Sequence, residues 1–239
     1  MSKIEIDINI PNELSGISVS QYQKYVQLWQ DNKDVDDYEF INKKTLEIFC
    51  GLDLHESYNI PINTFDNILK HINECFEEEK PLIKRFDMTD KDGVTVEFGF
   101  EPSLDKISYG AFKDAETYIR DAKDLHKLMA VLYRPVIKDI SNKYHYRIAE
   151  YKGSDDFSEV MKDAPVNVAL GMQVFFYRLG TKLSKYTMDS LVEQAKLTTN
   201  KEGKQLLEEN GEIINRFYAS HKTMYEDLMK SQSFHYTNV

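Results

Sequence analysis

Residues 82–100 constrain the fold most, because they contain two strand-like segments, LIKRFDM and VTVEFGF, on either side of TDKDG. In VTVEFGF, apolar residues occupy every second position, which is the pattern of a strand with one buried face. These positions are Val94, Val96, Phe98 and Phe100. The TDKDG segment, with its charged residues and terminal glycine, is typical of a turn. We therefore predict an antiparallel β-hairpin over residues 82–100.

Two further segments alternate in the same way. IEIDINI, residues 4–10, places its isoleucines on one face and its polar residues on the other. YHYRIAEY, residues 144–151, is expected to form a strand that extends the hairpin sheet.

The rest of the chain carries helical periodicity. Ser18 and Gln21 have the spacing of a capping box, so a helix is expected to begin there. The other helices are expected over about 34–50, from about 63 onward, over 111–133 with a break near 121–124, and from 154 to the end with breaks near Pro165 and 200–203. The last of them should cover about 204–230.

These patterns predict an α+β fold that is mainly α-helical. It should consist of a helical N-terminal unit with one strand, residues 1–80, a small antiparallel β-hairpin sheet with a helix and a strand, residues 81–152, and a long helical C-terminal portion, residues 153–239. No low-complexity linker separates the three parts, so we expect one continuous body. The 6 prolines and 10 glycines among 239 residues argue against disorder and against a many-turned β-sandwich.

Charge and composition exclude several classes of function. The formal net charge of −10 repels nucleic acid, and the sequence has no extended basic cluster, so nucleic-acid binding is not expected as the main role. No segment has the length or apolarity of a membrane span. Cys50 and Cys75 belong to no CxxC pair, and we interpret them as buried, reduced thiols in a reducing compartment. We expect the protein to work in the cytoplasm, or in a particle assembled there.

A charged residue ends an apolar helix in the segment HKLMAVLYRP, residues 126–135. The apolar run stops at an arginine that is followed by proline. Since a residue before proline avoids the helical conformation, Arg134 is expected to leave the helix at Pro135 and to cap its C-terminal end. Its guanidinium could hold a carboxylate of the neighbouring strands, and the candidates are Glu97, Glu101 and Glu150. The alternative is a clamp for a phosphate or a substrate.

Two sequence patterns contain residues that could bind a metal ion. Glu150–Tyr151–Lys152 has the E-x-K spacing of Mg²⁺-dependent nucleases of the restriction-endonuclease type, with Glu97 or Asp105 as the second carboxylate. His71 and Cys75 have i, i+4 spacing on a predicted helix, but no second pair of ligands accompanies them.

The motifs of serine hydrolases, P-loop NTPases and dinucleotide-binding enzymes do not occur in the sequence. We therefore expect no catalytic residues, no cofactor and no metal. In GMQVFFYRLGTKL, residues 171–183, three consecutive aromatic residues cover more than one side of a helix: Phe175, Phe176 and Tyr177. That helix is either a central core helix or one held between the body and a neighbouring subunit.

Five segments in order carry a resemblance to a known class of protein. They are PLIKRF, VEFGFEPSLDKISYGAFKDAETYI, LHKLMAVLYRP, YHYRIAEY and GMQVFFYRLGTKL. This succession, over about residues 80–190, resembles small proteins encoded among the virion and tail genes of tailed bacteriophages, notably the crAss-like phages of Bacteroidales. The resemblance rests on the order of the segments and on LYRP rather than on a catalytic signature.

The resemblance implies a non-enzymatic component of a phage particle, assembled in the host cytoplasm. Its relatives include ring or adaptor proteins at the head–tail junction, packaged cargo proteins and assembly factors. The implied partners are other virion proteins such as portal, tail or ring proteins, and further copies of the chain itself. Arg134, Pro135 and the three aromatic residues are then the candidate structural or interaction residues.

Overall fold

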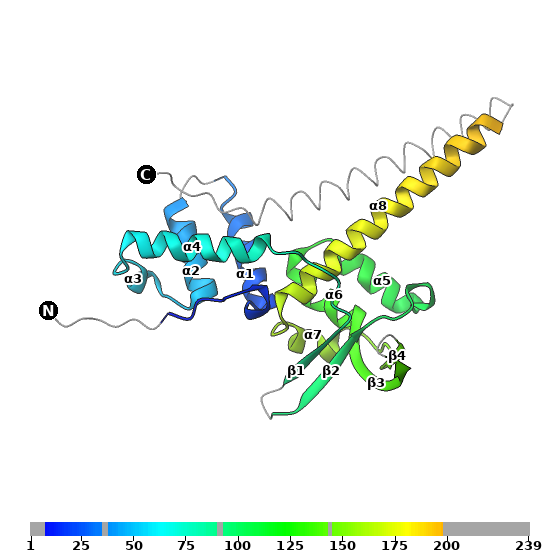
Figure 1. The fold of residues 1–239 in the computed structure, drawn as a ribbon, viewed down its shortest axis with the longest axis horizontal. Coiled ribbons are helices and arrows are strands. Elements are labelled where there is room, and N and C mark those ends of the chain that lie inside the picture. Colours follow the sequence, from blue (N-terminus) through cyan, green and yellow to red (C-terminus); the bar gives the residue numbers. More distant parts are fainter. Residues whose placement is uncertain (1–7, 35–37, 90–92, 143–144, 198–239) are drawn as a thin grey trace. The chain divides into compact units, whose positions relative to one another are not determined.

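The protein is α+β and mainly helical, as predicted (Figure 1). The structure is a computed structural model that describes residues 8–34, 38–89, 93–142 and 145–197. Within these residues the chain divides into two compact units between Leu170 and Gly171, inside helix α8 (Val166–Leu197). The three-part division at residues 80 and 152 stays a prediction. The break predicted at 200–203 and the helix predicted at about 204–230 lie outside the described residues.

Four helices form the N-terminal part of the first unit. They are α1 (Val19–Asp31), α2 (Tyr38–Cys50), α3 (Leu54–Ser57) and α4 (Ile62–Glu77), and α1 follows a short 3-10 helix, η1 (Leu14–Gly16). The capping box at the start of α1 is confirmed, because Gln21 N donates to Ser18 Oγ at 3.2 Å and Ser18 N donates to Gln21 Oε1 at 2.9 Å. Helix α3 was not predicted, because its four residues are too few to show a helical period.

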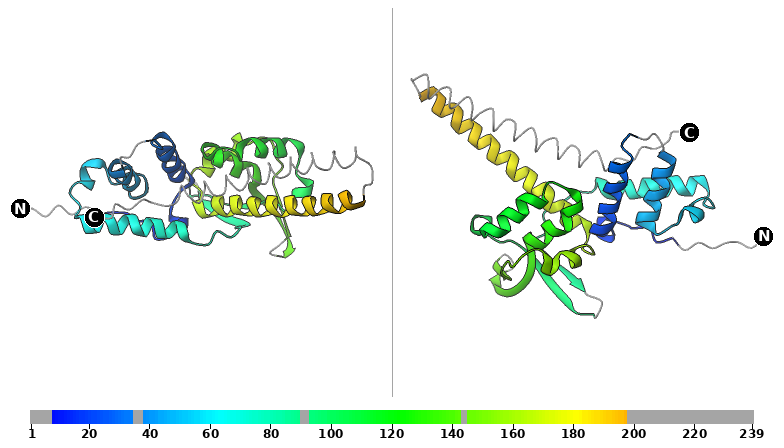
Figure 2. Two further views of the ribbon diagram at one scale, coloured as in Figure 1. Left: turned by 90° about the horizontal axis from the view of Figure 1, so that it is seen from above. Right: turned by 180° about the vertical axis from the view of Figure 1, so that it is seen from behind.

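An aromatic cluster joins three of these helices. α4 crosses α1 and α2 (Figures 1 and 2). The ring centroids of Tyr25 on α1 and Phe49 on α2 lie 5.2 Å apart, and Phe76 on α4 lies 5.7 Å from Phe49 and 6.1 Å from Tyr25. Burial of these three large rings helps to hold the short helices together, along with the buried aliphatic residues of the same helices.

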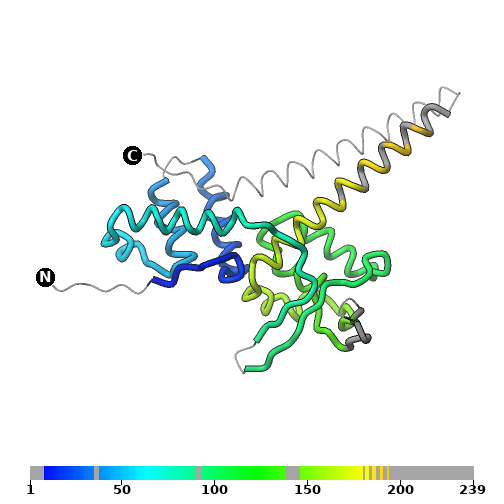
Figure 3. Tube along the Cα trace, in the orientation of Figure 1, coloured from blue at the N-terminus to red at the C-terminus, as the bar shows by residue number. Residues whose placement is uncertain are grey.

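The N-terminal strand predicted at residues 4–10 is not observed where the structure describes it. Residues 1–7 lie outside the described residues, and residues 8–10 belong to no helix or strand. The chain at this point follows α4 (Figure 3), and His71 Nε2 lies 3.1 Å from Pro11 O. Ile8 and Ile10 are half-buried and Asn9 is exposed, so the alternation here belongs to an extended segment beside a helix.

The sheet has four antiparallel strands in the order β1-β2-β3-β4. They are β1 (Arg85–Thr89), β2 (Thr95–Phe100), β3 (Tyr133–Asn142) and β4 (His145–Ile148). The hairpin predicted at 82–100 is confirmed as β1 and β2, with Phe86 opposite Phe98. The strand predicted at 144–151 is confirmed as the shorter β4, which joins the sheet by pairing with β3.

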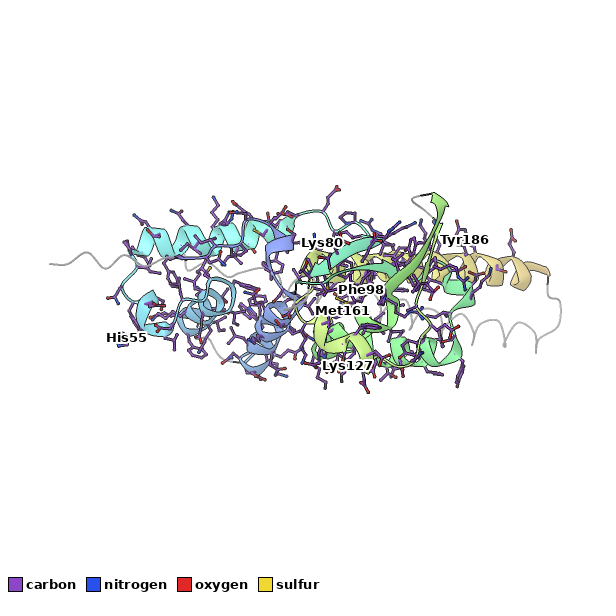
Figure 4. The ribbon with its side chains drawn as sticks, turned by 90° about the horizontal axis from the view of Figure 1, so that it is seen from below. His55, Lys80, Phe98, Lys127, Met161 and Tyr186 are labelled. Atoms are coloured by element: carbon purple, nitrogen blue, oxygen red, sulfur yellow. The ribbon has the colours of Figure 1, made fainter. Side chains whose placement is uncertain are left out.

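Helices of the same unit pack beside the sheet. They are α5 (Tyr109–Tyr118), α6 (Leu125–Leu132) and α7 (Asp155–Met161), with the 3-10 helices η2 (Leu104–Lys106) and η3 (Ala122–Asp124). The break predicted near residues 121–124 is confirmed, because η3 separates α5 from α6. Phe98 of β2 meets Phe157 of α7 edge to face at 5.7 Å, and Figure 4 shows Phe98 and Met161 inside this part of the unit.

The N-terminal helices are joined to the sheet-containing part at the start of α1. Val19 N donates to Ala164 O at 2.9 Å, Ser20 N donates to Lys162 O at 2.9 Å, and Val166 N donates to Ile17 O at 2.8 Å. The break predicted near Pro165 is confirmed, since the chain turns there between α7 and α8. The first two hydrogen bonds satisfy donors in the first turn of α1, and the third satisfies a donor in the first turn of α8, where no residue of the same helix could accept them.

Candidate functional site

Arg134 does not cap α6, contrary to the prediction. The helix ends at Leu132, its C-cap is Tyr133, and Tyr133 N donates to Met129 O. Arg134 is already the second residue of β3, opposite Gly99 of β2. The helix passes into the strand without a loop, because Tyr133 adopts extended backbone angles of φ −113° and ψ 121°.

Of the three candidate carboxylates, Glu101 is the one that pairs with Arg134. Arg134 Nη2 donates to Glu101 Oε2, and the side chains are only 8% and 12% exposed. The backbone next to this ion pair is hydrogen-bonded as well, since Glu101 N donates to Leu132 O at 2.8 Å. Burial lowers the pKa of Arg134, and Glu101 counteracts that shift. Both charges are largely removed from water, so each depends on the other for its stabilisation.

Tyr151 extends this ion pair into a network, which we call the Arg134 network. The guanidinium carbon lies 5.8 Å from the centroid of the Tyr151 ring, and Tyr151 Oη donates to Asp114 of α5. Burial, together with the hydrogen bond to Asp114, raises the pKa of Tyr151. The network consists of Glu101, Asp114, Arg134 and Tyr151, and it ties the residue after β2, strand β3 and helix α5 to the segment after β4. It balances much of its own charge, so a structural role suits it better than an anion clamp.

Pro135 occupies a position in β3 that tolerates proline. It lies opposite Phe98 of β2, and its carbonyl accepts a hydrogen bond from Ala149 N at 2.9 Å. In an antiparallel strand the N–H and C=O of one residue point to the same side, so the missing N–H faces β4. Regular pairing between β3 and β4 begins only at Val136, and the proline therefore costs little.

The structure gives the E-x-K residues other contacts. Both carboxylate oxygens of Glu97 accept hydrogen bonds from Arg85, at 2.7 Å from Nε and 2.5 Å from Nη2. Asp105 Oδ1 accepts from Ser103 Oγ at 2.7 Å, and Glu150 and Lys152 are exposed after the end of β4. Glu97 is thus already neutralised by Arg85, which opposes the metal binding that a nuclease would require of it.

His71 and Cys75 converge on one backbone carbonyl. His71 Nε2 lies 3.1 Å from Pro11 O, and Cys75 Sγ donates to the same oxygen at 3.7 Å. The part of the chain that the structure describes has no group of three or more His, Cys, Asp or Glu residues that could hold a metal ion. Both cysteines are free and buried, as predicted, and burial raises the pKa of Cys50 to about 11.

Phe175, Phe176 and Tyr177 lie in the unit that begins at Gly171, whereas Arg134 and Pro135 belong to the other unit. All three aromatic side chains are half-buried, and the Phe175 and Phe176 rings meet edge to face at 5.3 Å. Partial burial of all three side chains is compatible with a core helix of this unit and with a helix that contacts a second subunit. The choice between a core helix and an intersubunit helix therefore stays open.

Helix α5 carries an exposed aromatic pair that was not predicted from the sequence. Tyr109 is 78% exposed and Phe112 is 51% exposed, while the neighbouring Ala111 is buried. Their i, i+3 spacing places both rings on the same side of the helix. The i, i+3 spacing could not predict that these rings are exposed, because the same spacing of apolar residues more often marks the buried face of a helix.

Comparison with known proteins yields no relative: no protein family, no curated protein and no solved structure matches this chain. Among the described residues, no helix combines the length and the apolarity needed to span a membrane.

Proposed function

We propose that the chain is a non-enzymatic structural component of a tailed-phage particle and acts through contacts with other virion proteins and with copies of itself. The order of the five segments over residues 80–190 carries this proposal. They correspond to the region entering β1, to β2 through α5, to α6 with the start of β3, to β4, and to the first half of α8. The first four segments therefore supply the strands and helices of the sheet-containing part, and the fifth belongs to the unit that begins at Gly171.

The exposed aromatic pair on α5 supports the proposal. Exposed tyrosine and phenylalanine side chains are enriched where proteins bind one another, since they bury a large area at low entropic cost. Around them, Lys113 pairs with Glu116 at 2.8 Å, so the charges of this helix face are balanced although the chain carries −10 overall. A balanced aromatic face lowers the electrostatic cost of contact with another acidic subunit.

The proposal covers three positions in assembly: a ring or adaptor protein at the head–tail junction, a packaged cargo protein, and an assembly chaperone that leaves before the particle is complete. Mass spectrometry of purified particles separates them. A ring or adaptor protein should be present at a fixed copy number, and a cargo protein should be present and be lost when the particle is emptied. A chaperone should be absent from particles but necessary for their formation.

Paired variants test whether α5 carries the contact. Tyr109→Ser with Phe112→Ser should leave the fold intact, because both rings are exposed, and should reduce incorporation or assembly at least about tenfold. Thr117→Ala on the same helix is the matched control, since Thr117 is exposed but not aromatic. The proposed function would be overturned if normal particles contained no copy of the chain and also formed normally in its absence.

A further inference from the structure

His126 lies where α1, η3 and α7 approach the start of α6. It is 8% exposed, and its Nδ1 atom lies 3.0 Å from Nε2 of Gln23, a half-buried residue of α1. Gln23 Nε2 also donates to two backbone carbonyls, Ala122 O at 2.8 Å and Lys123 O at 2.7 Å. The two N–H groups of this amide nitrogen therefore face three acceptors of η3 and α6, so one hydrogen is shared between two acceptors.

The two carbonyls set the orientation of the Gln23 amide. If the amide were turned over, its oxygen would face two carbonyl oxygens and both hydrogen bonds would be lost. With the nitrogen in place, Nδ1 of His126 has to be an acceptor, so the imidazole is neutral and carries its proton on Nε2. A proton added at Nδ1 would point at the N–H groups of Gln23, and two donors would face each other.

The charged groups around His126 do not favour the protonated ring. Lys127 of α6 pairs with Asp124 at 2.8 Å, and Lys162 of the α7 C-terminus pairs with Glu159 at 2.7 Å. Burial lowers the pKa of His126, the two lysines lower it further, and the two carboxylates act in the opposite direction. From α1, the group that faces the ring is the uncharged Gln23 amide. Both carboxylates already have a cation, so the imidazolium would find no unpaired counterion.

We propose that Gln23 and His126 form a pH-sensitive joint, in which proton uptake by His126 breaks the Gln23 hydrogen bonds and releases α1 from η3. The sign follows from the neutral state of the folded ring. The joint is intact above the ordinary histidine pKa of about 6.5 and weakens as the pH falls through the lower value of the folded protein. Because α1 belongs to the N-terminal helices, acidification loosens their attachment to the sheet-containing part.

Amide hydrogen exchange of the full chain tests the joint. Exchange of the residues of α1, corrected for the intrinsic effect of pH, should accelerate at least about tenfold between pH ~7.5 and pH ~5. His126→Gln offers a carbonyl oxygen to the Gln23 amide and takes up no proton, so it should abolish the acceleration. His55→Gln is the matched control, since His55 is exposed on α3, at the outer end of the N-terminal helices (Figure 4), and it should behave like the parent protein.

A second variant and a direct titration keep the test decisive if His126→Gln folds poorly. Gln23→Leu should exchange fast in α1 at both pH values, with no further acceleration in acid. In the parent protein, the protonation of His126 followed by NMR should coincide with the acceleration in α1. An α1 that exchanges equally at both pH values, or a His126 that stays neutral while α1 opens, would overturn the proposal.

Discussion

At the scale of single residues, the Arg134–Glu101 ion pair is more deeply buried than the neighbouring Arg85–Glu97 pair of the sheet. Removing two charges from water costs several kcal/mol per ion, and their mutual attraction only repays this cost when both partners are present. Arg134 Nε finds no hydrogen-bond partner among the described residues, so part of the desolvation cost stays uncompensated. The pair therefore fixes the register of β2 and β3 more than it adds net stability.

Arg134→Ala should lower the free energy of unfolding by about 3 kcal/mol, because it leaves Glu101 as a buried, unpaired carboxylate. Arg120→Ala is the matched control: Arg120 is 72% exposed and lies 3.7 Å from Glu116, so its loss should change the free energy by less than about 0.5 kcal/mol. Chemical denaturation of the isolated protein measures both. If Arg134→Ala kept the stability of the parent and lost assembly instead, Arg134 would be an intersubunit residue.

At the scale of elements, the three strands β2, β3 and β4 meet around a glycine. A Cβ atom on Gly99 would lie 2.5 Å from Tyr146 Cε2 and 3.0 Å from Val136 Cγ2. The Tyr146 ring is anchored, since its hydroxyl donates to Phe100 O at 2.6 Å, and burial raises its pKa to about 12. The close packing of the sheet at this point requires the absence of a side chain at residue 99.

Gly99→Ala should therefore destabilise the protein by about 1–3 kcal/mol through overpacking against Tyr146. The same change in a Tyr146→Ala background should cost much less, and the difference between the two backgrounds gives the coupling energy. In Gly110→Ala, the control on α5, the nearest atom to the new Cβ lies at 3.9 Å, so stability should stay equal or rise. Equal costs of Gly99→Ala in both backgrounds would contradict the packing argument.

At the scale of the whole molecule, charge opposes the self-association that we propose. Each copy carries a formal charge of −10, and like-charged copies repel one another over distances that salt shortens. Burial of the exposed Tyr109 and Phe112 of α5, by contrast, would stabilise a contact between copies at any ionic strength. Association should therefore be limited by long-range repulsion.

Raising the NaCl concentration from about 0.05 M to about 0.5 M should strengthen self-association, because it shortens the Debye length from about 14 Å to about 4 Å. Sedimentation velocity at both concentrations measures the effect. Tyr109→Ser with Phe112→Ser keeps the charge and removes the aromatic face, so it should stay monomeric in both buffers. A parent protein that is monomeric throughout would show that α5 does not bind a second copy.

Local signals predicted several elements correctly. The hairpin, the capping box of Ser18 and Gln21, and the break at η3 all follow from hydrogen bonds and burial within a few residues. β3 was missed because its first residues continue the apolar run of α6, and the extended conformation of Tyr133 becomes visible only through its pairing with Phe100. One contact of the Arg134 network was predicted in part, since Glu101 was one of three candidate carboxylates for Arg134. The contacts of Tyr151 with Arg134 and Asp114 were not predicted.

The sequence by itself determined the class of fold, the position of most helices and the β1–β2 hairpin, since these depend on neighbours along the chain. Only the tertiary structure decided which carboxylate Arg134 meets, that Glu97 belongs to Arg85, and that Tyr109 and Phe112 face outward while similar residues elsewhere are buried. The physical reason is distance along the chain. Arg134 and Glu101 are 33 residues apart, and Gln23 and His126 are 103 apart, so no local pattern encodes their contacts.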